Sequence, residues 1–87
     1  MDARALVARN LRRLRVRKKL SQENLAVDAD VDRSYVGRLE RGQENPTVAM
    51  LERLAEALDA EIVELFAVPK PGEPTPKPLP GGRRPSR

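Results

Sequence analysis

Apolar residues recur at helical spacing through the first 66 residues of this 87-residue chain, and no segment alternates between apolar and polar residues as a strand does. The spacing predicts helices over residues 3–18, 22–29, 33–41, 48–58 and 61–66. A chain of this length has room for only one small hydrophobic core. The sequence therefore predicts a compact all-α domain of five helices.

Short polar side chains precede three of these helices and predict where each one begins. Ser21, Asp32 and Thr47 can each accept a hydrogen bond from a free N–H group in the first helical turn. Gly42 follows the third helix, where a glycine in the left-handed conformation often ends a helix. Asp30 lies in the turn before that helix, and aspartate tolerates positive φ better than most residues.

The composition changes abruptly after Val68. The remaining segment, PKPGEPTPKPLPGGRRPSR, holds seven of the eight prolines and three of the five glycines. Such a segment cannot bury enough apolar area to offset the entropy lost on ordering. We therefore expect a folded domain over residues 3–68 and a basic, Pro-rich, disordered tail over residues 69–87.

Charge is distributed very unevenly along the chain. Residues 1–20 carry eight basic and one acidic side chain, residues 21–68 carry four and eleven, and residues 69–87 carry five and one. A strongly basic beginning and end suggest a polyanionic partner. The alternative is a solvated helix face with a solubilising tail, and charge alone favours neither.

Several classes of function are excluded by residue types that the sequence lacks. Without cysteine or histidine there are no disulfides, no usual zinc site and no histidine general base. No paired carboxylates occur in a pocket-forming context, so we expect neither an enzyme nor a bound metal, cofactor or small-molecule ligand. The sequence has no apolar run of 18 residues and no signal-peptide pattern, which predicts a cytoplasmic protein.

The second and third predicted helices are both short and are separated by a turn of three to four residues, which is the geometry of a helix-turn-helix. That motif needs a small residue where the two helices cross. Ala26 supplies one opposite Val36. In a helix-turn-helix the second helix lies in the major groove of DNA.

Several motifs at matching intervals make this chain resemble the XRE helix-turn-helix family, the group of the lambdoid Cro and cI repressors. The resemblance covers residues 6–66, and its motifs are Leu14-Arg15, Leu20-Ser21-Gln22, Leu25-Ala26, Glu40-Arg41-Gly42, Asn45-Pro46 and Leu54-Ala55 with Leu58. The four residues from Asp32 to Tyr35 are also similar to the controller proteins of restriction-modification systems. The resemblance implies a lambda-repressor-like fold. Two residues depart from the family pattern, Asp30 in place of a turn glycine and Glu44 in place of a frequently basic loop residue.

One side of the third predicted helix is entirely polar. On a helical wheel a continuous arc is formed by Arg33, Ser34, Gly37, Arg38 and Arg41. Arg33 and Arg38 are the candidates for base contacts, because a guanidinium can bond guanine O6 and N7 together. Ser34 would add a short contact, and Gly37 would let the backbone approach the groove. The alternative is a solvated helix face with a tolerated glycine.

Other residues are candidates for phosphate contacts. They are Gln22, Arg15, Tyr35, Arg41, Asn45 and Thr47. Gln22 begins a helix, which is a natural site for an anion, whereas Asn45 and Thr47 are equally well explained as turn and cap residues. The family resemblance implies that Arg15 bridges to Glu40. Tyr35 is alternatively a packing residue with its hydroxyl at the rim.

The end of the domain carries more apolar residues than one small core needs. Family members pair through this region, so the resemblance implies a homodimer with an interface formed by Ile62, Val63, Leu65 and Phe66. A two-fold dimer would bind an inverted repeat with half-sites about 34 to 36 Å apart. The alternative is that these side chains close the core of one chain, as we expect of Ile62 and Leu65.

Two functions follow from these patterns. The first is a sequence-specific transcriptional regulator that binds double-stranded DNA through the helix at residues 33–41. The second is an antitoxin-like or coactivator-like module that uses its tail or its acidic face, residues 44–64, to bind a protein and binds DNA secondarily.

Overall fold

The structure, a computed structural model, describes residues 2–70 and 72 and contains four α-helices followed by one short 3-10 helix in that part of the chain. The elements are α1 (Ala3–Arg17), α2 (Gln22–Ala29), α3 (Arg33–Glu40), α4 (Val48–Ala57) and η1 (Ile62–Phe66). The all-α class is confirmed, and the fifth element is a 3-10 helix. None of the described helices is long and apolar enough to cross a membrane. The predicted tail lies outside the described residues apart from residues 69, 70 and 72.

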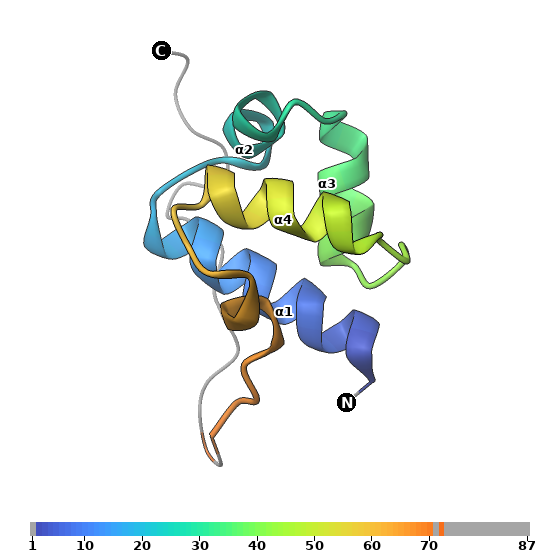
Figure 1. The fold of residues 1–87 in the computed structure, drawn as a ribbon, viewed down its shortest axis with the longest axis vertical. Coiled ribbons are helices and arrows are strands. Elements are labelled where there is room, and N and C mark those ends of the chain that lie inside the picture. The colour runs from blue at the N-terminus through green and yellow to red at the C-terminus, as the bar shows by residue number, and fades with distance from the viewer. Residues whose placement is uncertain (1, 71, 73–87) are drawn as a thin grey trace.

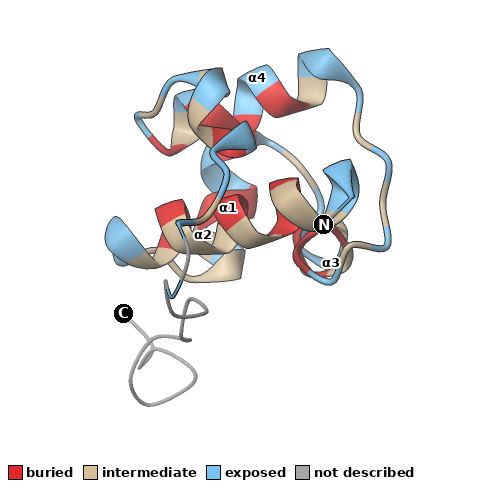
Figure 2. Cartoon of the chain, turned by 90° about the horizontal axis from the view of Figure 1, so that it is seen from below, coloured by how far each residue is buried: buried red, intermediate tan, exposed pale blue. Residues whose placement is uncertain are grey.

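The helices surround a single core (Figure 1). α2 packs against α3 and α4, while α1 contacts α3 and η1, and α4 also contacts η1. Each helix contributes one buried side, as the burial colours in Figure 2 show. The most deeply buried apolar side chains are Leu11, Leu14, Leu25, Val36, Leu39, Leu54 and Leu65. This core holds α3 in place by its apolar side and leaves its other side at the surface.

The predicted helix starts are confirmed by hydrogen bonds. The Ser21 hydroxyl accepts from the backbone N–H of residue 24 at 3.0 Å, the Asp32 carboxylate from that of residue 34 at 3.1 Å, and the Thr47 hydroxyl from that of residue 50 at 3.0 Å. Gly42 has φ +73°, and Asp30 has φ +58°. Both residues therefore adopt the left-handed conformation expected of them.

A buried polar residue that belongs to none of the sequence motifs attaches η1 to α1. The Asn10 side-chain amide donates to the carbonyl of Leu65 at 3.0 Å and to that of Ala67 at 2.9 Å. Its oxygen accepts from Arg13 Nε at 3.1 Å, and Arg13 Nη2 donates to the carbonyl of Glu64 at 3.3 Å. Because Asn10 is completely buried, these bonds satisfy polar groups that water does not reach.

Candidate nucleic-acid interface

The surface side of α3 carries the polar residues that the wheel predicted there. Arg33 and Ser34 are exposed and Arg38 is half-buried, whereas Val36 and Leu39 on the other side are buried. Ser34 and Arg38 are four residues apart and share the surface side, whereas Val36 and Leu39 are three residues apart and share the buried side. α3 therefore presents a polar face at the surface while its opposite side packs into the core.

Gly37 belongs to the predicted polar side of α3 but is buried. A Cβ atom at Gly37 would lie 3.3 Å from Nη1 of Arg41 and 3.7 Å from Oε1 of Gln22. The side chain of Arg41 and the start of α2 therefore cover the glycine. Its lack of a side chain lets these two polar groups come close to the backbone of α3.

Arg38 is held by neighbours within α3 and by one residue in the loop that follows it. Its Nε donates to Glu44 Oε2 at 2.6 Å, and its Nη1 donates to Ser34 Oγ at 3.3 Å. Its guanidinium carbon lies 5.9 Å from the centre of the Tyr35 ring, within the range of a cation–π contact. Ser34 Oγ in turn donates to the Asp32 carboxylate. Arg38 is thus the centre of a polar chain along the exposed surface.

Tyr35 lies half-buried between the polar face and the core. Burial raises the pKa of its hydroxyl, and the negative charge of Glu44 raises it further. The hydroxyl therefore stays protonated at neutral pH and keeps its hydrogen-bond donor. Its ring packs against the core, which supports the packing interpretation without removing the donor.

The carboxylate of Glu40 connects three helices. Arg15 donates to it from Nε at 2.6 Å and from Nη2 at 3.0 Å, and Gln22 Nε2 donates at 3.0 Å. Arg12 Nε adds a longer contact of 3.4 Å. Arg15 also donates from Nη1 to the carbonyl of Leu20 at 2.8 Å, so all three of its nitrogens bind protein atoms. The implied Arg15–Glu40 bridge is present, and Arg15 is only 6% exposed.

The remaining phosphate candidates lie around the α3–α4 loop. Arg41 is exposed, and its Nε donates to Gln43 Oε1 at 3.2 Å. Asn45 and Thr47 are exposed as well. Thr47 already caps α4 through its oxygen, which leaves its hydroxyl hydrogen available to an acceptor.

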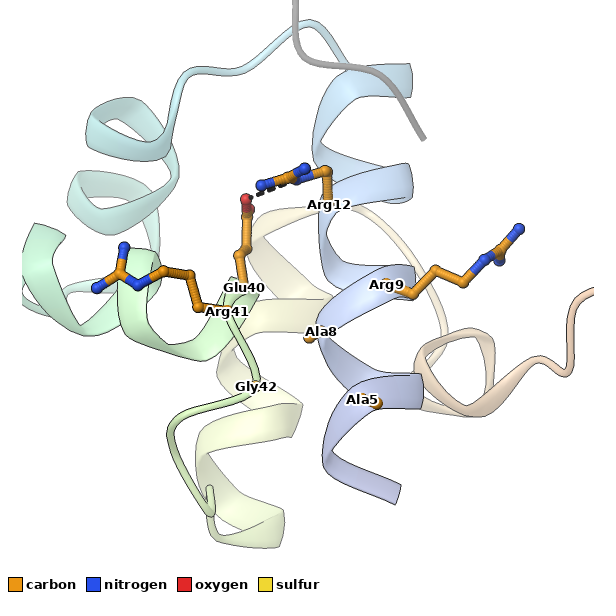
Figure 3. A pocket seen from close by; sticks show the side chains of 7 residues that line it. All are labelled: Ala5, Ala8, Arg9, Arg12, Glu40, Arg41 and Gly42. Carbon is orange, nitrogen blue, oxygen red and sulfur yellow. Dashed lines mark hydrogen bonds and ion pairs between the residues drawn. The ribbon is translucent and has the colours of Figure 1, made fainter. Parts of the chain in front are cut away.

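A pocket of about 250 Å³ lies between α1 and the end of α3. Ala5 and Ala8 line it on the α1 side, and Glu40 lines it from α3. Figure 3 shows Glu40 directed toward Arg12, while Arg9 and Arg41 extend to opposite sides. Because the carboxylate in this pocket already has four protein donors, it offers little to a further polar group.

The apolar residues near the C-terminal end fall into two groups. Leu65 is completely buried and Ile62 packs partly buried against the core, so Leu65 offers no surface to a second chain. Val63, Phe66 and Val68 are exposed by 68, 42 and 78%. Exposed apolar side chains therefore gather on and after η1.

Comparisons with known proteins agree with this architecture. The helix-turn-helix family HTH_3 matches residues 11–65. The uncharacterized HTH-type transcriptional regulator y4dJ of Sinorhizobium fredii is 46% identical over 65 residues, which are 75% of this chain and 84% of that protein. The crystal structure of the restriction-modification controller protein C.AhdI of Aeromonas hydrophila is 49% identical, with a TM-score of 0.71 over 72% of this chain and 96% of that one. The controller protein C.Esp1396I, solved as a tetramer with its natural 35 base-pair operator, is 29% identical, with a TM-score of 0.70 over 76% and 87% of the two chains.

Proposed function

The chain belongs to the HTH_3 helix-turn-helix family of DNA-binding transcriptional regulators, as its motifs indicated, and from that premise we propose that it binds an inverted-repeat operator as a homodimer in the cytoplasm. In this proposal α3 lies in the major groove. The observation that carries it is the polar face of α3, which the core anchors from behind. As in its family, the activity is binding and not catalysis.

The proposed base contacts are made by the exposed side chains of α3. Arg33 extends from the first turn, where recognition helices approach base edges most closely. Arg38 lies further along the same face and retains donors on its guanidinium. Ser34 lies between them and adds a hydroxyl at the same surface. Gly37 contributes by letting α2 and the Arg41 side chain lie close to this helix.

The proposed phosphate contacts flank this face. Gln22 is the first residue of α2, where unpaired backbone N–H groups attract an anion. Arg41, Asn45 and Thr47 would contact the backbone from the α3–α4 loop. Arg15 acts indirectly in this proposal, because its bonds to Glu40 position the ends of α2 and α3.

The proposed dimer uses the exposed apolar surface formed by Val63, Phe66 and Val68. Asn10 fixes the backbone of this segment to α1, so the surface is presented at a constant position relative to α3. A two-fold axis there would place two copies of α3 on one face of the duplex. C.Esp1396I, whose structure contains a tetramer on an operator, gives a precedent for assembly on DNA in a similar chain.

Selection of binding sites from random duplexes tests the proposal. The expected result is a discrete inverted repeat with half-sites about one helical turn apart. Arg33→Ala should weaken binding to the selected site by about 5- to 150-fold and relax the preference at one base pair of each half-site. Arg17→Ala is the control, because Arg17 is exposed, carries the same charge and contacts Glu64 of η1 at 3.4 Å. Equal, weak binding of all duplexes would instead indicate the protein-interaction module.

A further inference from the structure

The geometry around Arg38 points to Glu44 as a specificity-determining residue that positions the Arg38 guanidinium for a single base contact and withholds it from phosphates. This inference rests on the proposed DNA binding. Glu44 lies at a loop position where a basic residue is frequent in the family. A carboxylate at a DNA-binding face would ordinarily weaken binding through its charge. Its contact with Arg38 gives it a different role.

The guanidinium of Arg38 is held at three points. Glu44 Oε2 accepts a hydrogen bond from Nε at 2.6 Å, and Ser34 Oγ accepts one from Nη1 at 3.3 Å. The centre of the Tyr35 ring lies 5.9 Å from the guanidinium carbon. Asp32 accepts from Ser34 and so fixes the orientation of that hydroxyl. A long arginine side chain normally loses considerable rotamer entropy when it is ordered by a ligand. Here much of that ordering precedes DNA binding.

The hydrogens left on the guanidinium define how it can bind a base. Arginine has five N–H groups, and the contacts with Glu44 and Ser34 use two of them. Within residues 2–70 no hydrogen bond or ion pair engages Nη2 of Arg38. A guanine could be approached either by the end of the guanidinium, through Nη1 and Nη2, or by its side, through Nε and Nη2. Because Glu44 occupies Nε, only the end remains for guanine O6 and N7.

The charge of Glu44 acts on a different class of contact. Its side chain is 27% exposed and that of Arg38 is 42% exposed, so DNA bound to α3 in the proposed manner could contact both groups. A phosphate is attracted mainly by net charge, and the carboxylate offsets that of Arg38. A guanine edge is neutral and depends on the direction of the donors. Glu44 therefore lowers the affinity for random DNA more than the affinity for a site that contains the correct base. The ratio of these two affinities is the specificity, and it rises.

Four variants separate positioning from charge. Glu44→Ala removes both the acceptor and the charge, whereas Glu44→Gln removes the charge and keeps an oxygen that can accept from Arg38 Nε. Arg38→Ala removes the reading group, and the double variant Arg38→Ala/Glu44→Ala tests whether the two residues act together. Glu23→Gln is the matched control, because Glu23 is an exposed acid in the first turn of α2 and its loss changes the net charge equally.

Each protein is used for site selection from random duplexes and for affinity measurements on the selected site and on a random duplex. We expect Glu44→Ala to reduce the preference at one base pair of the half-site by at least about fivefold and to raise affinity for the random duplex. Glu44→Gln should raise random affinity but keep most of that preference. Arg38→Ala should lose the preference at the same base pair, and the double variant should lose no more. Glu23→Gln should leave every base preference unchanged.

Two results would overturn the inference. If Glu44→Ala kept every base preference and raised affinity for both duplexes by the same factor, Glu44 would act only by repelling phosphates. If Glu44→Ala and Arg38→Ala relaxed different base pairs, Glu44 would not act through Arg38. Failure of the proposed function is distinguishable from both, because the wild-type protein would then select no site at all.

Discussion

The guanidinium of Arg15 holds the carboxylate of Glu40 through two hydrogen bonds, Nε to Oε2 at 2.6 Å and Nη2 to Oε1 at 3.0 Å. The Arg15 side chain is 8% exposed and that of Glu40 is not exposed. Since Arg15 belongs to α1 and Glu40 is the last residue of α3, the pair fixes the end of α3 to α1. Gln22 joins the same carboxylate, so the start of α2 is fixed with it.

Removal of the Glu40 carboxylate should strongly destabilise the fold. We expect Glu40→Ala to lower the free energy of unfolding by about 3 to 5 kcal/mol, because it leaves the Arg15 guanidinium buried without its counter-charge. Urea denaturation followed by circular dichroism measures the change. Arg17→Ala is the control, since it breaks an exposed pair and should cost no more than about 1 kcal/mol. Equal costs for both variants would mean that Arg15 finds other partners.

The turn between α2 and α3 should depend on the backbone conformation of residue 30. Asp30 has φ +58°, and its carbonyl accepts from Arg53 Nη2 at 2.5 Å. We expect Asp30→Gly to be neutral or to stabilise by up to about 1 kcal/mol, because glycine adopts this conformation without steric cost. Asp30→Val should destabilise by about 1 to 2 kcal/mol, because a β-branched residue is strained there. Thermal unfolding would give the order, and a Val variant as stable as the Gly variant would contradict it.

The cap of α3 should make the fold sensitive to acid. Hydrogen bonds from Ser34, first from its hydroxyl and also from its backbone N–H, hold the pKa of Asp32 below its ordinary range. A carboxyl whose pKa is lower in the folded chain stabilises the fold above the unfolded pKa, and that stabilisation disappears as the pH falls through the folded pKa. Asp32→Asn keeps a capping oxygen but does not titrate.

The advantage of the wild type over Asp32→Asn should therefore be full at neutral pH, begin to fall near the ordinary aspartate pKa of about 4, and vanish as the pH falls through the lowered pKa of Asp32. Denaturation at a series of pH values measures it, and NMR titration of the Asp32 carboxyl gives its midpoint. Ser34→Ala should move that midpoint upward, since it removes the hydroxyl donor. A midpoint unchanged by Ser34→Ala would show that other groups hold the pKa down.

The starts of the helices and the polar face of α3 could be predicted because they depend on local sequence. Ser21, Asp32 and Thr47 bond to N–H groups two or three residues later, so residue type and spacing are sufficient. Arg33 is exposed and Leu39 is buried according to the same helical period. The 3-10 geometry of the last segment was not predicted, because a single turn carries too little periodicity to distinguish it from an α-helix.

Contacts made through loops and between distant segments could not be read from periodicity. Glu44 reaches Arg38 after the chain turns at Gly42, and Asn10 bonds to carbonyls 55 and 57 residues later. The burial of Gly37 depends on side chains that fold over it from α2 and from the α3–α4 loop. Predicting these features requires the three-dimensional path of the chain, whereas the position of a helix can be predicted from the order of residues alone.

Gly37→Ala should stabilise the fold and weaken DNA binding. Alanine is favoured over glycine inside a helix by up to about 1 kcal/mol, and the tightest contact of its Cβ, at 3.3 Å, is with the flexible end of Arg41. Moving the Arg41 side chain would displace one proposed phosphate contact, whereas Gln22 Oε1, at 3.7 Å from the Cβ, need not move. Urea denaturation and operator affinity measure the two effects, and Arg41→Ala combined with Gly37→Ala should show less than additive loss of affinity. A stabilised variant with unchanged affinity would mean that the glycine is merely tolerated.

The exposed apolar surface after η1 provides the test of dimerisation. In a two-fold dimer each Val63 would lie near the symmetry-related surface, so Val63→Glu would bury two like charges at one interface. We expect it to weaken self-association by at least about tenfold, as measured by sedimentation equilibrium. Val27→Glu is the matched control, because Val27 of α2 is 73% exposed and Val63 is 68% exposed. Operator binding by Val63→Glu should then require a higher protein concentration, while Val27→Glu associates like the wild type. If the two variants dissociated equally, or if the wild type were monomeric at micromolar concentration, this surface would not be the dimer interface.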